Sequence, residues 1–432
     1  MRSNADIVIC GAGITGIAAA YHLAVRHGRR VLLVDERQPL TLTSDKGTQG
    51  YRNWWPGPDD TMLRLISRSI DLMEETARES GNAFRLNRRG YLFATANEAQ
   101  ATEMEATARQ VSSYGMGPLR LHPGSEPYRP APAEGFEDQP VGADLLRGDS
   151  LRRAFPYLAP ETVAALHIRR AGCFNGIAFG QWMLTRALSN GAEFVHDAVV
   201  GVDHSGGRVN NVRLASGGVI ETSQLVIAAG PALPNVARML DLELPVVHEL
   251  HAKVTLRDTR HAVPRHAPFL IWNDPVANRR GGAHLRPVDL THGDELYLLW
   301  TYETDVQPYV WPPTFDAAYA RIVLEGTAQI VPALAPYIAQ VARDGAQVDG
   351  GYYCKTAENR PLVGPLPVEG AYVLGAVSGS GIMGAHGCAE LVAAHVTGAT
   401  LPDYAKWFLP SRYDDPAYRA LIEQWGPLVG QL

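Results

Sequence analysis

The chain has 432 residues, 46% hydrophobic and 19% charged, and a formal net charge of −6. This composition is typical of a water-soluble protein of about two or three domains, and the negative charge argues against nucleic acid or an anionic membrane as the main partner. No apolar run is long enough to cross a bilayer, no targeting segment precedes the first apolar run, and the four cysteines lack metal-type spacing. We therefore expect a cytoplasmic protein with reduced thiols and no metal site.

A nucleotide-binding pattern occupies the first 36 residues. An apolar run is followed by three glycines in the spacing GxGxxG, by an alanine-rich helical stretch, and by a second apolar run that ends at Asp35. The first glycine allows a tight turn, the second lets the backbone approach a pyrophosphate, and the third lets the helix pack on the strand. The phosphates would bind to the free amides at the helix start. The residues expected at the dinucleotide are Gly11, Ala12, Gly13, Ile14, Thr15 and Gly16 at the turn, with Asp35, Glu36 and Arg37 at the ribose.

Later patterns predict a mixture of helices and strands. Apolar residues at helical spacing predict helices at residues 59–80, 97–113, 176–190, 315–330 and 388–396. Alternating or continuous apolar residues predict strands at residues 199–202, 209–214, 225–230, 251–256, 295–302 and 372–375. Residues 118–140 contain six prolines, and we interpret them as an irregular surface excursion, over the active site. The central block, residues 244–349, is expected to form a mixed or antiparallel sheet.

Four motifs together resemble the superfamily of D-amino acid oxidase, glycine oxidase and monomeric sarcosine oxidase, which are FAD-dependent. They are the N-terminal glycine turn, Leu225-Val-Ile-Ala-Ala-Gly-Pro, Thr356-Ala-Glu-Asn-Arg-Pro-Leu-Val-Gly-Pro and Ser378-Gly-Ser-Gly-Ile-Met. The resemblance covers nearly the whole chain. It implies an α/β fold, with a Rossmann-like FAD-binding domain and an inserted substrate domain built on a mixed or antiparallel sheet. The FAD-binding domain would comprise residues 1–84, 150–235 and 350–432, and the substrate domain residues 85–149 and 236–349.

The same resemblance assigns further residues to the cofactor. Val200 would meet the adenine through its backbone, and Ala229 and Gly230 would lie at the diphosphate. Amides at the last glycine turn would stabilise the negative charge that develops on the pyrimidine edge of the reduced flavin. The residues assigned in this way are Thr43, Ser44, Lys46, Val200, Ala229, Gly230, Gly379, Ser380, Gly381, Ile382 and Met383.

Some positions depart from the resemblance. The cysteine that binds flavin covalently in sarcosine oxidases aligns with Gly351, and Cys354 is displaced by three residues, so we expect non-covalent FAD. A lysine that binds the substrate carboxylate aligns with Met383. The lysine linked to oxygen reactivity aligns with Tyr297, and the arginine that other members use for the carboxylate aligns near Tyr353. The electron acceptor, oxygen or another molecule, stays open.

The candidate catalytic residues come from a loop and two strands. Arg52 offers a bidentate fork for a substrate carboxylate, against the alternative of a structural salt bridge. His251 suits a base that removes a proton from an ammonium group, and Lys253 lies two residues further along the same strand face. Tyr352 and Tyr353 are adjacent in a strand, so we expect only one of them to face the site.

The favoured function is FAD-dependent oxidation of a C–N bond in an amine, N-alkyl amine or amino-acid-like small molecule, with hydride transfer to flavin N5 and an imine product. A flavin monooxygenase or a reductase is an alternative, although no second GxGxxG follows a strand to bind NAD(P)H. A non-catalytic FAD-binding subunit of a larger complex is the alternative from a different class.

Overall fold

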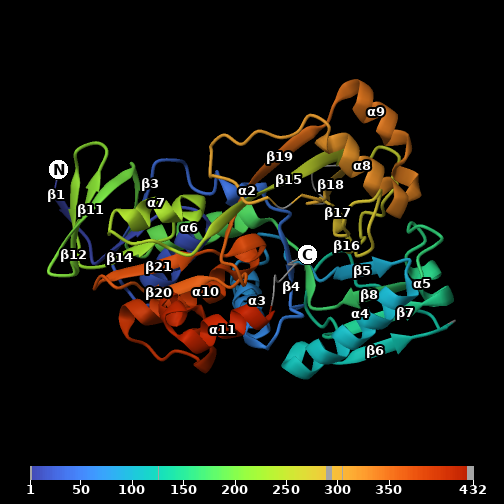
Figure 1. The fold of residues 1–432 in the computed structure, drawn as a ribbon, viewed down its shortest axis with the longest axis horizontal. Helices are drawn as coiled ribbons and strands as arrows, with labels where there is room; N and C mark the ends of the chain where they lie inside the picture. Colours follow the sequence, from blue (N-terminus) through green and yellow to red (C-terminus); the bar gives the residue numbers. More distant parts are fainter. Residues whose placement is uncertain (1, 125, 289–293, 304, 426–432) are drawn as a thin grey trace.

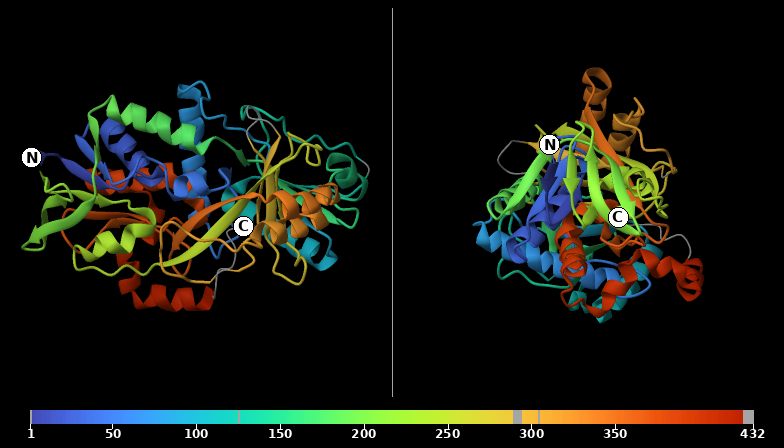
Figure 2. Two further views of the ribbon diagram at one scale, coloured as in Figure 1. Left: turned by 90° about the horizontal axis from the view of Figure 1, so that it is seen from above. Right: turned by 90° about the vertical axis from the view of Figure 1, so that its left-hand side faces the viewer.

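The computed structural model describes residues 2–124, 126–288, 294–303 and 305–425. Two large sheets lie toward opposite ends of an elongated α/β molecule, as Figure 1 and the left view of Figure 2 show. The chain passes between them several times, because each sheet combines strands from distant parts of the sequence. The mixed α/β fold predicted from the sequence is confirmed.

The first large sheet has six strands in the order β10-β3-β2-β14-β21-β20. Only β20 runs antiparallel to its neighbour; the other pairs are parallel. The strands are β2 (Ile7–Cys10), β3 (Val31–Asp35), β10 (Ala192–His196), β14 (Leu225–Ile227), β20 (Leu362–Pro365) and β21 (Ala371–Gly375). The central strands β2, β3 and β14 are continuous apolar runs, because both faces of a parallel sheet are covered there.

The alternation of side chains along β2 shows which layers cover the sheet. Ile7 and Ile9 pack in the core shared with helices, whereas Val8 and Cys10 pack in a core shared with a four-stranded sheet. The helices of this part of the chain are α1 (Ile14–Tyr21), α2 (Thr43–Lys46), α3 (Thr61–Glu79), α6 (Gly176–Leu188), α7 (Leu233–Arg238), α10 (Gly381–Thr397) and α11 (Pro416–Trp425). The small sheet, in the order β1-β13-β12-β11, contains β1 (Arg2–Asn4), β11 (Val199–Ser205), β12 (Arg208–Leu214) and β13 (Val219–Glu221).

The second large sheet has nine strands in the order β19-β15-β18-β17-β16-β5-β8-β7-β6 and is mainly antiparallel. Its strands are β5 (Tyr91–Thr95), β6 (Leu119–His122), β7 (Ala143–Arg147), β8 (Ala164–Ile168), β15 (Val247–Arg257), β16 (Phe269–Trp272), β17 (Ala283–Pro287), β18 (Glu295–Leu299) and β19 (Gln347–Lys355). The other helices of this part are α4 (Glu98–Val111), α5 (Gly148–Ala154), α8 (Tyr319–Ile330) and α9 (Pro336–Asp344). Figure 1 shows α8 and α9 together at one end of this sheet.

A short two-stranded sheet joins the two halves of the molecule. It pairs β4 (Gly50–Arg52) with β9 (Ala171–Cys173) in antiparallel register. The domain division expected from the sequence places residues 150–235 with the nucleotide unit. In the structure β8, which lies in that range, hydrogen-bonds between β5 and β7 in the nine-stranded sheet.

The helices predicted at residues 59–80, 97–113, 176–190 and 315–330 are confirmed as α3, α4, α6 and α8. The expectation for residues 118–140 is wrong in its first part, because β6 forms there and pairs in parallel with β7. Two of the six prolines flank that strand, so they do not interrupt its ladder. None of the described residues in 118–140 lines the central cavity.

The four cysteines are buried and unpaired with one another. Burial raises the pKa of the Cys10, Cys354 and Cys388 thiols to about 12. Among the described helices, none combines the length and the apolar character needed to span a membrane.

Candidate cofactor and substrate site

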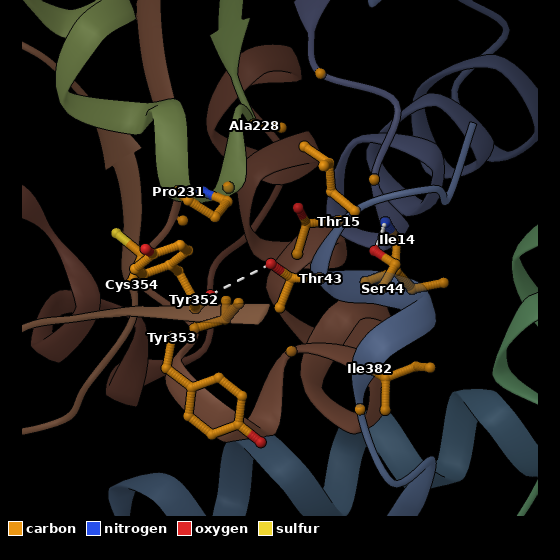
Figure 3. A pocket seen from close by; sticks show the side chains of 18 of the residues that line it. Ile14, Thr15, Thr43, Ser44, Ala228, Pro231, Tyr352, Tyr353, Cys354 and Ile382 are labelled. Carbon is orange, nitrogen blue, oxygen red and sulfur yellow. Dashed lines mark hydrogen bonds between the residues drawn. The ribbon is translucent and has the colours of Figure 1, made fainter. Parts of the chain in front are cut away.

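A cavity of about 460 Å³ lies where the carboxyl ends of the parallel strands meet the nine-stranded sheet (Figure 3). We call its two parts the nucleotide end and the substrate end. The nucleotide end is lined by Gly11–Thr15, Asp35–Arg37, Asp197–Val199 and Ala228–Ala232. The substrate end is lined by Arg52, Tyr91, His251, Phe269, Ile271, His284, Leu299 and Tyr353.

The three glycines of the first turn have different surroundings. A Cβ on Gly11 would lie 2.4 Å from the Ala228 oxygen, and Gly11 also has a φ of +111°. A Cβ on Gly16 would lie 1.9 Å from the Gly11 oxygen. A Cβ on Gly13 would meet only the Ser44 hydroxyl, at 3.4 Å. Gly11 and Gly16 are thus required by the fold itself, whereas the backbone at Gly13 is open toward the cavity.

Helix α1 begins directly after this turn, so its first amides lie at the cavity. The first N–H groups of a helix have no acceptor within it, and they favour an anion. The Ile14 amide donates a hydrogen bond to the Ser44 hydroxyl, 3.0 Å away. Backbone amides at a helix start, next to a glycine that leaves room for a ligand, are hydrogen-bond donors that suit the pyrophosphate of FAD.

Asp35, the last residue of β3, is hydrogen-bonded to the glycine turn. Its carboxylate accepts hydrogen bonds from the Ala12 amide at 2.7 Å and the Arg37 amide at 2.8 Å. Burial raises the pKa of Asp35, and these two amides oppose that effect. Glu36 and Arg37 line the cavity beside it. The role of this acid at a ribose stays a prediction.

Most residues assigned to the cofactor line the cavity. Beyond the first turn these are Thr43, Ser44, Ala229, Gly230, Gly379, Gly381, Ile382 and Met383. The Thr43 hydroxyl also donates to the Tyr352 carbonyl oxygen at 3.2 Å, which joins α2 to β19 across the cavity (Figure 3).

Val200, Lys46 and Ser380 do not line the cavity. Val200 is 51% exposed on β11, and Asp197–Val199 line the cavity in its place, one step earlier along the chain. Lys46 forms ion pairs with Asp45 and Asp349, at 3.1 and 3.2 Å. The Ser380 hydroxyl donates to a backbone oxygen at 2.6 Å, so it caps the short turn before α10.

Arg52, the last residue of β4, is buried at the substrate end. Its guanidinium lies over the rings of Trp55 and Tyr91, 5.4 and 5.3 Å from their centroids. Burial lowers the pKa of Arg52, but a guanidinium keeps its charge at any physiological pH. Among the described residues that line the cavity, the acidic ones are Asp35, Glu36 and Asp197, all at the nucleotide end.

His251 is held by both of its ring nitrogens. Nε2 lies 3.3 Å from a carboxylate oxygen of Glu249, and Nδ1 lies 2.9 Å from the Thr301 hydroxyl. Because a carboxylate only accepts, Nε2 donates to Glu249 and Nδ1 accepts from Thr301. Burial lowers the pKa of His251, although Glu249 opposes that effect. The neutral ring stacks on Tyr353 with the centroids 3.7 Å apart.

His284, on β17, is a polar residue of the substrate end that sequence reasoning missed. Its Nδ1 donates to the Gly282 carbonyl oxygen at 2.9 Å, so Nε2 carries the lone pair. Burial lowers the pKa of His284 to about 4, which keeps the ring neutral. Within the described part of the chain, no residue bonds to Nε2. The short strand carries no motif, and only its alternating pattern could have indicated that His284 faces inward.

Lys253 and the two tyrosines differ from expectation. Lys253 is buried away from the cavity, where its Nζ donates to the Lys46 carbonyl oxygen at 2.8 Å. Tyr352 and Tyr353 both line the cavity, so the expectation that only one faces the site is wrong. Strand β19 is the edge of its sheet, and the cavity extends past both of its faces. In Figure 3 the two rings point to opposite sides.

Comparisons with known proteins support one family. The sequence model of the family described as FAD dependent oxidoreductase matches residues 6–395. Mitochondrial sarcosine dehydrogenase from Mus musculus is 27% identical over 266 residues, which is 59% of this chain and 26% of that protein. D-amino acid dehydrogenase from Methylobacterium sp. (strain 4-46) is 26% identical over 293 residues, 56% of this chain and 64% of that protein. The chain therefore spans less than two thirds of the length of either relative.

A solved structure shows the same fold. L-proline dehydrogenase from P. horikoshii superposes with a TM-score of 0.78 at 20% identity, covering 96% of this chain and 99% of that one. The family match extends over the glycine turn, both large sheets and most of α10. The glycine turn at the cavity also fits a flavin dinucleotide. Because the family model matches residues 6–395, the chain belongs to the FAD dependent oxidoreductase family.

Proposed function

We propose that this protein oxidises the C–N bond of an amino-acid-like substrate, removing a hydride from the carbon next to nitrogen and leaving an imine. The three similar proteins are named as dehydrogenases of sarcosine, a D-amino acid and L-proline. FAD bound without a covalent link would supply the two-electron oxidation, held by the glycine turn and the other residues of the nucleotide end. The chain's own residues have to bind the substrate, orient it, exclude water and accept a proton.

The observation that carries this proposal is the buried guanidinium of Arg52 at the substrate end. A guanidinium forms its strongest contacts with a carboxylate, through two parallel hydrogen bonds. Tyr91 already interacts with this guanidinium, and a substrate carboxylate that enters this end of the cavity would add a charged partner to it. This favours an amino acid over a simple amine.

The nitrogen of the substrate has to be neutral before a hydride can leave the adjacent carbon. His284 presents an Nε2 lone pair, and its lowered pKa keeps that nitrogen unprotonated at neutral pH. We assign this nitrogen as the hydrogen-bond acceptor that orients an N–H of the neutral substrate amine. His251 has both nitrogens bound to protein groups, so its stacked pair with Tyr353 forms a rigid wall instead.

Apolar side chains complete the substrate end. Phe269, Ile271 and Leu299 line it, and the ring of Phe269 stacks on Tyr91 with centroids 4.4 Å apart. These surfaces exclude water from the reacting carbon and suit an apolar substrate side chain.

Anaerobic mixing of the FAD-loaded protein with matched substrate pairs tests the proposal. Each pair contains an amino acid, in both chiral forms where they exist, and the amine that lacks its carboxylate: proline with pyrrolidine, sarcosine with dimethylamine, phenylalanine with phenethylamine. We expect the flavin absorbance at 450 nm, roughly the usual maximum of an oxidised flavin, to bleach with a carboxylate-bearing member and much more slowly with its amine. Bleaching by the amines alone would exclude the assigned role of Arg52. No bleaching across the panel would favour the non-catalytic FAD-binding subunit.

A further inference from the structure

An extended segment of residues 306–315, which we call the strap, connects β18 to α8. Its residues alternate between exposed and partly buried positions, and the backbone bends at Trp311 and Pro312. The exposed positions include Val306 and Val310, which are 63% and 58% exposed. The inward-facing, partly buried positions are Gln307, Tyr309, Trp311, Pro313 and Phe315.

Both ends of the strap are fixed to the nine-stranded sheet. Val306 pairs antiparallel with Glu249, and the Gln307 amide donates to the His248 carbonyl oxygen at 3.0 Å. At the other end, the Phe315 ring lies against Gly350, so closely that a Cβ there would be 2.9 Å from it. The strap therefore crosses β15 and β19 and is held on both, while its middle is free of backbone ladders in the described chain.

The middle of the strap reaches the nucleotide end of the cavity. Tyr309 lines the cavity and packs edge-on against Tyr352, with the ring centroids 5.4 Å apart. Burial raises the pKa of Tyr309, and the charges of Arg37 and Glu36 also act on it. This phenol is thus close to the acidic end of β3, although it comes from the opposite half of the chain.

Trp311 contacts Arg37, a residue that lines the cavity, although Trp311 itself is not part of that lining. Its indole ring covers the Arg37 guanidinium at 5.5 Å. Arg37 lines the cavity, and its own amide is bound to Asp35. A cation at this distance from the face of an indole ring is attracted to it electrostatically. Trp311 therefore positions the Arg37 guanidinium beside Asp35, the residue expected at the ribose.

We propose that the strap closes over the adenosine half of FAD, that Tyr309 is a cofactor-binding residue and that Trp311 positions Arg37. The glycine turn grips the phosphates from one side, and the strap would cover the purine nucleoside from the other, through aromatic surface and the positioned Arg37. A purine offers a flat face to any aromatic side chain. Such a cover would retain a dinucleotide that lacks a covalent bond to the protein.

Titration of the apoprotein with FAD, followed by quenching of flavin fluorescence, tests the proposal. Tyr309→Ala is expected to raise the Kd for FAD about tenfold or more, the size of one base–aromatic stack. Trp311→Ala should also raise the Kd, because Arg37 would lose the ring that positions it. Val310→Ala lies between them in the same strap but points outward, so its Kd should match the wild type. Wild-type Kd values for both Tyr309→Ala and Trp311→Ala would overturn the proposal.

A second measurement needs no variant. Hydrogen–deuterium exchange of wild-type peptides covering residues 305–318 should slow when FAD binds, and should slow to a similar extent with ADP, which carries only the adenosine half. Exchange that is unchanged by FAD, or slowed by FAD but not by ADP, would show that the strap does not cover the adenosine and would overturn the proposal.

Discussion

At the scale of single residues, the site depends on a few polar groups whose state is fixed by what surrounds them. Arg52 keeps its charge in a wall of aromatic rings, and His284 keeps a lone pair because its other nitrogen donates to a carbonyl. His251 lies as close to the cavity, but its two hydrogen bonds leave no nitrogen for a substrate. Position alone therefore does not define the role of a histidine.

Removal of the guanidinium tests this residue-scale account. Arg52→Met is expected to weaken binding of an amino-acid substrate by about 30-fold or more, because the loss of one partner in a buried charge pair costs about 2–5 kcal/mol. The measurement is the substrate dependence of anaerobic flavin bleaching. Arg152→Met, which changes an exposed arginine of α5, is the control and should match the wild type. Unchanged binding in Arg52→Met would contradict the proposed carboxylate site.

At the scale of elements, the glycines between β2 and the first turn of α1 have two roles: Gly11 and Gly16 allow close packing, and Gly13 leaves the backbone open toward the cavity. The GxGxxG pattern and the acid at the end of β3 are local in sequence, so this element could be predicted in full. The substrate end could be predicted only in part: the sequence indicated Arg52 and Tyr353, but it missed His284, because the strand that carries it is placed by long-range pairing. The contact assigned to Val200 stays a prediction, because it would be made by the backbone, and the neighbouring Val199 lines the cavity.

Two alanine substitutions distinguish the glycines. Gly13→Ala should fold normally, since its φ of −73° suits alanine and the nearest neighbour of the new Cβ is 3.4 Å away, but FAD binding should fall sharply. Gly16→Ala should unfold more easily even without FAD, because its Cβ would overlap a backbone oxygen. Circular dichroism melting of the apoproteins and FAD titration separate the two effects. Wild-type affinity for FAD in Gly13→Ala would exclude close approach of the pyrophosphate at this residue.

The pairing of β15 with β19 gives a prediction about pH. Burial alone would raise the pKa of Glu249, but hydrogen bonds from His251 and Lys355 outweigh it and lower the pKa to about 2. A carboxyl group whose pKa falls on folding stabilises the protein above its ordinary value of 4.5, and this stability is lost as pH falls toward about 2.

Glu249→Gln should therefore lower the free energy of unfolding by about 1.5–3 kcal/mol at pH 7, the usual size for hydrogen bonds to a charged group. The difference from the wild type should shrink as the pH of urea unfolding experiments is lowered below 4.5. Glu103→Gln, on the exposed face of α4, should show neither effect. A difference that stays constant with pH would rule out a charged Glu249 as its source.

At the scale of the whole molecule, the cavity is where the two large sheets meet. One wall comes from the parallel sheet and its helices, and the other comes from β15, β17 and β19. The order of the motifs along the chain was enough to predict this arrangement of a nucleotide unit with a second sheet. The prediction failed where elements change sides, as with β8, because hydrogen-bonded partners are not encoded in local composition.

A ligand that contacts both walls should stabilise both. FAD at about a hundredfold above its Kd is expected to raise the free energy of unfolding by about 2.7 kcal/mol and to shift a single melting transition upward. Differential scanning calorimetry of the apoprotein with increasing FAD measures this. Two transitions, of which FAD moves only one, would show that the cofactor is held by one sheet alone.

Because the four cysteines are buried, their reaction with an alkylating reagent reports which part of the structure has opened. Alkylating reagents attack the thiolate, and the thiols of Cys10, Cys354 and Cys388 stay protonated far above neutral pH. Cys10 and Cys354 line the cavity, whereas Cys173 and Cys388 lie elsewhere in the core. Mass spectrometry of labelled peptides would thus tell a brief parting of the cavity walls, which modifies the first pair, from complete loss of structure, which modifies all four.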